Sequence, residues 1–229
     1  HELPGVGRGM QDHPKISYRF WVGYDLPTWP HPWIQVLLTS TAEVHGEERL
    51  FQVMPYIGFT EGGHRITEFN VQVADSRGRT GQVDISSTNP MDQPVLRMGW
   101  LEEPGDRELA EAAGRELMAV ARTQPLAPML DEWPNLDDPD HVLRTTETFH
   151  HVVASLRMGA ADDPMAVTDG DGRIHGMEGV WCMDASVIPR VPSANTHLAV
   201  IALAEKLGAG FLGMTGHGDA AVAPPAVTA

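Results

Sequence analysis

The sequence has little of three features that would each point to a class of protein. It has a single cysteine, Cys182, so an intramolecular disulfide framework is excluded. It has few cationic residues: 16 Lys and Arg, compared with 31 Asp and Glu, give a formal net charge of −15. Nucleic acids and anionic membrane surfaces both require clustered cations, so neither is expected as a partner. No run of 18 or more apolar residues occurs, so no membrane-spanning helix is expected.

Motifs of several common kinds of site are also absent. The 11 histidines include no H-x-x-x-H pair and no His/Cys cluster at ligand spacing, so no metal site is expected. No G-x-G-x-x-G turn follows a predicted strand, so the chain shows no dinucleotide-binding start. No N-x-S/T sequon occurs, which favours a cytoplasmic protein over a secreted one.

The first part of the chain reads as a β-sheet. With 229 residues, 42% of them hydrophobic, the chain can bury a sizeable core in one or two domains. From about residue 15 to residue 85, β-branched and aromatic residues alternate with polar ones between Gly and Pro. This pattern predicts a mostly antiparallel sheet with one face toward solvent or ligand. The predicted strands are residues 16–22, 34–38, 50–57, 69–73 and 81–86, and an Asn89-Pro90 turn follows them.

Further along, the hydrophobic period becomes helical. Leu109, Leu117 and Val120 predict a helix over residues 106–122. Residues 137–140 predict the start of a second helix that ends before Phe149, because an Asp can cap it and Pro fits its first turn.

The last part of the chain has two predicted elements and a tail. Residues 179–184 are predicted as a buried strand, and residues 196–207 as an apolar helix closed by Gly208. The tail from Met214 onward is rich in Ala, Pro and Gly and is expected to fray.

Three segments together resemble one known family. Residues 3–14 read L-P-G-V-G-R-G-M-Q-D-H-P, and residues 150–159 read H-H-V-V-A-S-L-R-M-G. Residues 184–189 read D-A-S-V-I-P and run into Asn195-Thr196-His197. In this order they resemble the L-P-G-V-G-R-N-L-Q-D-H-P, H-x-x-G/A-T/S-x-R-M-G and D-A-S-V-x-P…N-T-N/H signatures of the glucose-methanol-choline (GMC) flavin oxidoreductases. Three ordered matches spread over most of the chain are hard to obtain by chance.

The resemblance implies an α/β (α+β) fold of GMC type. Its parts are an antiparallel-sheet substrate domain and the C-terminal strand and helix of an FAD-binding Rossmann-like domain. On this pattern, residues 1–14 form a connection that covers the flavin, 15–149 the substrate-binding domain, 150–213 the C-terminal part of the FAD-binding domain, and 214–229 a flexible tail. Because the G-x-G-x-x-G start is missing, we expect a C-terminal part that needs an N-terminal FAD-binding polypeptide as its partner. A higher oligomer also stays open.

The resemblance assigns two catalytic roles. His151 has the spacing of the family's general base, a task that suits an imidazole with an ordinary pKa of about 6.5. His150 is one residue out of that spacing and, on an extended backbone, would point the other way. Asn195 stands where family members carry His or Asn and would donate a hydrogen bond to the substrate oxygen. Asn195 is also predicted as a helix N-cap.

The remaining assignments concern FAD. The backbone of residues 195–197 is expected to contact the flavin, with the helix N-terminus pointing at the pyrimidine side, where negative charge accumulates on reduction. Asp184 resembles the acidic residue that reaches the ribityl or phosphate region, and Asp12 and His13 resemble a loop over the flavin. The expected cofactor-binding residues are Asp12, His13, Asp184, Ala185, Asn195, Thr196 and His197.

The leading hypothesis is the C-terminal chain of an FAD-dependent oxidoreductase that oxidises a small-molecule alcohol to a carbonyl. The reaction would combine proton abstraction by His151 with hydride transfer to flavin N5. Two alternatives stay open. One is a GMC-fold hydroxynitrile lyase, in which flavin is bound but not reduced, and the other is a non-catalytic binding module. The sequence identifies neither the substrate nor the electron acceptor.

Overall fold

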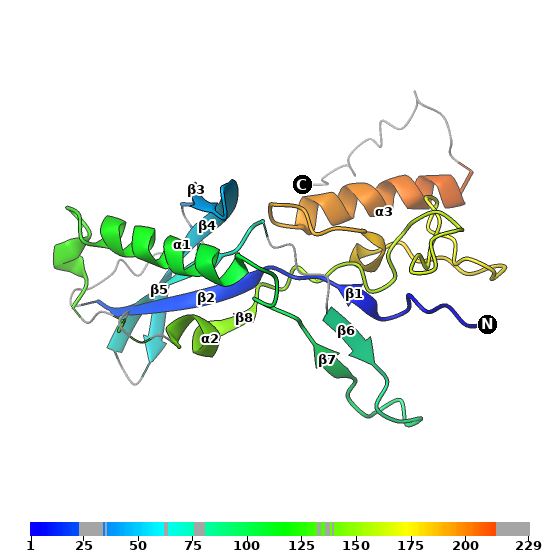
Figure 1. Ribbon diagram of the computed structural model, residues 1–229, viewed down its shortest axis with the longest axis horizontal. Helices are drawn as coiled ribbons and strands as arrows, with labels where there is room; N and C mark the ends of the chain where they lie inside the picture. Colours follow the sequence, from blue (N-terminus) through cyan, green and yellow to red (C-terminus); the bar gives the residue numbers. More distant parts are fainter. Residues whose placement is uncertain are drawn as a thin grey trace, which may run out of the picture.

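A five-stranded antiparallel sheet forms the larger part of the molecule (Figure 1). The computed structural model describes residues 1–22, 34, 36–61, 64–75, 81–131, 134–135, 138 and 140–213. The order of the strands in this sheet is β3-β4-β5-β2-β8. Their bounds are β2 Pro14–Trp21, β3 Leu38–Val44, β4 Glu47–Glu61, β5 His64–Gln72 and β8 Thr146–Thr148.

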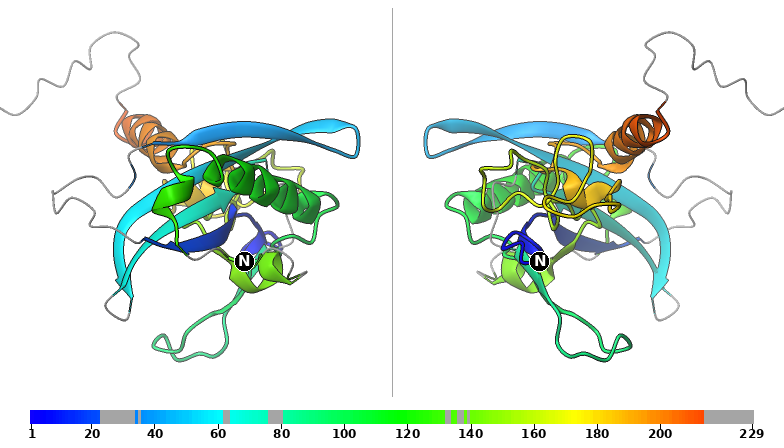
Figure 2. Two further views of the ribbon diagram at one scale, coloured as in Figure 1. Left: turned by 90° about the vertical axis from the view of Figure 1, so that its left-hand side faces the viewer. Right: turned by 90° about the vertical axis from the view of Figure 1, so that its right-hand side faces the viewer.

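A long helix covers one face of this sheet (Figure 2). Helix α1, Asp106–Ala121, turns its small and apolar residues toward the sheet, where Leu109, Ala113 and Leu117 are almost fully buried. The even-numbered residues of β2 meet them in the core, which holds Ile16, Tyr18 and Phe20 among others. The odd-numbered residues of β2 therefore lie on the opposite face, because successive side chains of a strand alternate.

Two close contacts hold α1 on the sheet. Gly114 lies under the ring of Tyr18, and a Cβ at this position would stand 2.2 Å from the Tyr18 hydroxyl oxygen. At the start of the helix, Asp106 is fully buried and pairs with Arg49 of β4, whose side chain is 3% exposed. A charge buried to this degree needs such a partner, so the pair fixes the end of the helix on the sheet.

The remaining elements are shorter. A small sheet of order β1-β6-β7 contains Arg8–Met10, Gly81–Asp84 and Val95–Arg97. The short helix α2, His141–Thr145, precedes β8, and α3, His197–Phe211, is the last described helix. Two 3-10 turns span Ala127–Met129 and Ala185–Val187. Figure 1 shows α3 and the irregular segment before it at the end of the molecule away from most of the large sheet.

Most predicted strands and both predicted helices of the first 150 residues are confirmed. Four of the strands correspond to β2, β4, β5 and β6, and the helix at 106–122 corresponds to α1. The strand predicted at 34–38 is wrong: the strand that pairs with β4 is Leu38–Val44, and Ile34 forms only an isolated bridge to Tyr56. In this strand Thr39, Thr41 and Glu43 face solvent, and Ser40 interrupts the inner face of Leu38, Ala42 and Val44, so its apolar pattern is weak. The Asn89 turn is confirmed between β6 and β7.

The predictions for the last 50 described residues need two corrections. Residues 179–184 do not form a buried strand, because Val180 and Trp181 are exposed and only an isolated bridge joins Trp181 to Arg173. The last helix does not stop at Gly208. It continues to Phe211. Gly213, two residues past this end, has a positive φ of 71°. Pro139, predicted in the first turn of α2, and the tail from Met214 lie outside the described residues.

Candidate active site

Two chain segments meet where β2 begins and β8 ends. Gln11 and Val153 exchange both backbone hydrogen bonds, at 3.0 and 2.9 Å, and the Phe149 N–H donates to the carbonyl of His13 at 3.3 Å. Between these pairings the chain bends at His150, whose φ is +62°. The expectation of an extended backbone at His150 is therefore wrong. The bend leaves His150 exposed and places His151 half-buried at the junction.

Asp12 holds this bend in place. Its side chain is buried, and its two oxygens accept hydrogen bonds from the His151 N–H at 2.9 Å and from the Thr148 hydroxyl at 2.7 Å. The Thr148 oxygen in turn accepts from the His150 N–H at 2.9 Å. Charge-assisted bonds of this kind are stronger than neutral ones, so Asp12 fixes the backbone that carries His151.

The rings of His13 and His151 contact each other directly. Their Nδ1 atoms lie 2.9 Å apart, with the ring planes at 90°. Phe149 stacks on the other side of the His151 ring, at a centroid distance of 5.1 Å and an interplanar angle of 22°. His13 is fully buried, and the side-chain nitrogen of Gln72 lies 3.0 Å from its Nδ1. His151 is therefore held on two sides by side chains of the same chain.

The hydrogen-bonding roles of these two rings depend on their tautomers. A neutral imidazole nitrogen carries either one proton or one lone pair, so in the contact between the rings one Nδ1 donates and the other accepts. Nε2 of His13 is buried and, among the described residues, has no hydrogen-bond partner. If Nδ1 of His151 is the donor, its lone pair lies on Nε2, the nitrogen that does not contact His13.

Both imidazoles are neutral near pH 7. Burial, followed by the nearby His151, lowers the pKa of His13 from 6.5 to about 4. Burial also lowers the pKa of His151, against the opposing charge of Asp12, and His150 lowers it further. A neutral His151 with an available Nε2 lone pair can take a proton from a hydroxyl group placed beside it.

Gln11 links this junction to the segment before α3. Its side-chain nitrogen donates to the carbonyl of Pro189 at 3.2 Å, and its side-chain oxygen accepts from the Val191 N–H at 3.1 Å. Val153, Ala154 and Val191 form a small second core beneath these bonds. The segment with the D-A-S-V-I-P motif is thereby held against the strand that leads into His13.

Asp184 organises the turn that follows it. Its Oδ1 accepts from the Ser186 N–H at 2.8 Å and from the Ser186 hydroxyl at 2.6 Å, which caps the 3-10 turn Ala185–Val187. Partial burial raises the pKa of Asp184, but the hydrogen bonds from Ser186 and Cys182 outweigh it and hold the pKa below its ordinary value. The contacts of Asp184 give it a role in local structure, and its predicted contact with FAD stays a prediction.

Asn195, Thr196 and His197 lie at the start of α3. Asn195 and His197 are exposed, whereas Thr196 is buried and its carbonyl accepts from the Val200 N–H at 2.9 Å. Asn195 is not the N-cap, which corrects the prediction: the capping position belongs to Thr196, without a side-chain bond to the helix. Across the described ranges, no hydrogen bond occupies the side chain of Asn195, so its amide faces outward.

The structure brings together only part of the predicted set. Asp12, His13 and His151 form one cluster, and Gln11 bonds Val191, four residues before Asn195, to the segment that leads into it. The motifs did not assign roles to Gln72, Thr148 and Phe149, which complete the cluster. In the parts of the chain that the structure describes, no group of three or more His, Cys, Asp or Glu side chains could hold a metal ion, and no helix is long and apolar enough to cross a membrane.

Comparison with known proteins gives consistent matches along the chain. The family described as GMC oxidoreductase matches residues 76–204. The oxygen-dependent choline dehydrogenase of Stenotrophomonas maltophilia strain K279a is 27% identical over 94% of this chain and 45% of its own length. The choline oxidase of Arthrobacter globiformis is 27% identical over 90% of this chain and 41% of its own. The chain thus spans less than half the length of these relatives.

Solved structures agree with the sequence matches. Pyridoxine 4-oxidase from Mesorbium loti superposes with a TM-score of 0.79 at 20% identity, over 93% of this chain and 44% of the oxidase. A formate oxidase superposes with a TM-score of 0.78 at 15% identity, over 93% and 48%. At these identities the likeness establishes the fold, including the predicted antiparallel sheet and α/β character. Because the family match covers more than half of its residues, the chain belongs to the GMC oxidoreductase family.

Proposed function

We propose that this chain is the C-terminal part of an FAD-dependent enzyme that oxidises an alcohol to a carbonyl compound. The observation that carries the proposal is the Nδ1 to Nδ1 contact of 2.9 Å between His151 and the buried, neutral His13. In the proposed tautomer His151 carries its proton on Nδ1, donates it to His13, and has Nε2 available as a base. In the proposed reaction His151 takes the hydroxyl proton, and the Asn195 amide donates a hydrogen bond to the oxygen that develops charge.

The residues of this chain fit the binding of FAD. The first-turn N–H groups of α3 have no side-chain cap, and both Asn195 and His197 are exposed there. The N-terminus of a helix attracts groups that carry or develop negative charge. When bound, FAD would accept the hydride from the alcohol carbon. The residues proposed to hold it are Asp184 and Ala185 and, at the helix start, Asn195, Thr196 and His197.

We further propose an N-terminal FAD-binding polypeptide as the partner. Helix α3 is strongly apolar, yet Leu207 is its only buried residue among the described positions. Leu198 is 77% exposed, Leu212 just past the helix is 69% exposed, and Phe211 is 56% exposed. Exposed apolar side chains at both ends of an apolar helix support a surface that another polypeptide covers. The chain length relative to its relatives supports the same partner.

The test is anaerobic mixing of the complete flavoenzyme with candidate alcohols. Substrate-driven loss of the oxidised-flavin absorbance is expected for the native protein. His151→Ala should slow this reduction by about 100-fold or more, because general base catalysis contributes roughly 100- to 10,000-fold. His150→Ala, one residue away and exposed, is the matched control and should retain the native rate. An unchanged rate in His151→Ala would refute the role of His151, and cyanide release from a cyanohydrin without flavin reduction would favour the lyase.

A further inference from the structure

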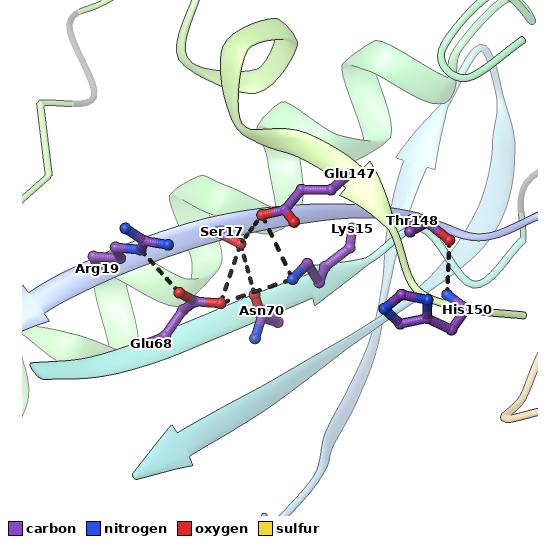
Figure 3. A network of polar contacts seen from close by, with 8 residues as sticks. All are labelled: Lys15, Ser17, Arg19, Glu68, Asn70, Glu147, Thr148 and His150. Carbon is purple, nitrogen blue, oxygen red and sulfur yellow. Dashed lines mark hydrogen bonds and ion pairs between the residues drawn. The ribbon is translucent and has the colours of Figure 1, made fainter. Parts of the chain in front are cut away.

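The face of the large sheet opposite α1 carries a row of polar side chains from β2, β5 and β8 (Figure 3). Side chains two positions apart in a strand share a face, so the residues after His13 at odd positions of β2 continue along it. Strand β5 pairs with β2 from Ile66 to Gln72 and adds its even positions to the same face. The row consists of Lys15, Ser17 and Arg19 from β2, Glu68, Asn70 and Gln72 from β5, and Glu147 from β8.

The charges in this row compensate one another. Nζ of Lys15 lies 3.6 Å from Glu147 and 3.8 Å from Glu68, and Nε of Arg19 donates to Glu68 at 2.9 Å. The Ser17 hydroxyl lies between these groups, 3.3 Å from Glu68 and 3.4 Å from Glu147. Two cations therefore face two carboxylates, and both carboxylates already have a cationic partner.

Part of the row can be reached from solvent. Ser17, Arg19 and Glu147 line a cavity of about 500 Å³, within the range of about 300 to 1,000 Å³ typical of small-molecule sites. The Glu147 side chain is 53% exposed, whereas that of Lys15 is 18% exposed. Glu147 and the buried Ser17 thus line the cavity together, and Lys15 borders it through its ion pair with Glu147.

The row begins beside His13, the residue that contacts His151. Lys15 follows His13 by two residues, and a strand advances about 7 Å over that interval. The backbone of Lys15 is also paired with Gln72, whose side chain contacts His13. An extended alcohol with one hydroxyl at His151 and its chain along the row would bring its other hydroxyls toward Lys15 and Glu147.

Resting on the function proposed above, we propose that Lys15, with the Glu68 and Glu147 carboxylates that it pairs, selects a neutral polyhydroxylated alcohol and rejects an alcohol with a fixed positive charge. Hydroxyl groups can accept from Lys15 and donate to Glu147. A quaternary ammonium group would instead be placed beside Lys15, and each carboxylate that could attract it is already neutralised. The substrate class of this chain thereby differs from the choline named in its relatives.

The test measures binding and reduction separately in the complete flavoenzyme. Sorbitol, choline and neohexanol, the uncharged carbon isostere of choline, are mixed anaerobically with the oxidised protein. The dissociation constant is read from the rapid perturbation of the flavin spectrum, and the reduction rate from the slower bleaching. Native protein should bind sorbitol most tightly and neohexanol about tenfold more tightly than choline, since like charges side by side are strongly unfavourable.

Three variants identify the source of this selectivity. Lys15→Glu should reverse the preference, so that choline binds about tenfold more tightly than neohexanol, and should weaken sorbitol binding. Lys15→Gln leaves Glu147 without its cationic partner and should also favour choline over neohexanol, by less than Lys15→Glu does. Arg107→Glu makes the same change of charge on α1, across the sheet, and should leave the native order unchanged.

Two results would overturn the inference. One is native protein that binds choline as tightly as neohexanol, and the other is Lys15→Glu with an unaltered ratio of the two constants. Sorbitol that binds no better than neohexanol would refute the polyhydroxylated class. Failure of the proposed function has a different signature: saturable binding of alcohols in the native protein with no bleaching of the flavin by any of them.

Discussion

Replacing His13 with glutamine should remove a pH dependence of stability that the native chain carries. His13 is fully buried, and burial together with His151 lowers its pKa to about 4 from an ordinary value of 6.5. Between these two values the unfolded chain binds a proton that the folded chain excludes, so folding becomes less favourable as the pH falls. The loss begins near the unfolded pKa and is complete below the folded one.

The size of the effect follows from the two pKa values. The linkage relation gives a loss of about 2 kcal/mol from His13 between about pH 7.5 and about pH 5, and about 3 kcal/mol at about pH 4. Glutamine does not titrate, and its side-chain oxygen can still accept from Nδ1 of His151. The free energy of unfolding of His13→Gln should therefore fall about 2 kcal/mol less than that of the native protein between about pH 7.5 and about pH 5.

Urea unfolding of the complete protein at several pH values, followed by tryptophan fluorescence, measures this difference. His197→Gln, which removes an exposed histidine, is the matched control and should keep the native pH dependence. If the native and His13→Gln curves of unfolding free energy against pH run parallel, the assignment of a buried neutral His13 is refuted.

Three further predictions concern packing and the active site. Gly114→Ala should destabilise the protein by about 1 to 3 kcal/mol because its Cβ meets the Tyr18 hydroxyl, and adding Tyr18→Phe should recover part of this in thermal unfolding. Arg49→Met should cost about 3 to 5 kcal/mol by leaving Asp106 buried without its cation, and the double variant with Asp106→Leu should be much less destabilised in urea. In a plot of kcat/KM against pH, the fall on the acid side should have its midpoint below pH 6.5, because burial lowers the pKa of His151. A midpoint above pH 6.5 would contradict this.

The motifs singled out His151, Asp12, His13 and the helix start, but not Gln72, Thr148 and Phe149, which complete the cluster. His151 was assigned by its spacing to an Arg-Met-Gly tripeptide, which a sequence displays directly. Gln72 meets His13 across 59 positions of sequence, and that contact depends on the register between β2 and β5. Register is a property of two strands together, so no single stretch of sequence discloses it.

The two strand errors have opposite causes. Leu38–Val44 is a hairpin strand with one face toward solvent, and its content of Thr, Ser and Glu is typical of a loop. Residues 179–184 contain Val180 and Trp181, which resemble a buried strand but are exposed in this chain. Apolar composition indicates that a segment tends to be covered, and it does not say whether the covering surface belongs to the same polypeptide.

The alternation of side chains along β2 has a practical consequence for engineering. Ile16, Tyr18 and Phe20 face the core and α1, while Lys15 and its neighbours at odd positions face the opposite way. Libraries confined to the odd positions would therefore vary the chemistry of the outer face while the residues that hold the sheet to its helix stay constant. Tolerance to mutation and choice of substrate can then be adjusted as two independent variables within a single strand.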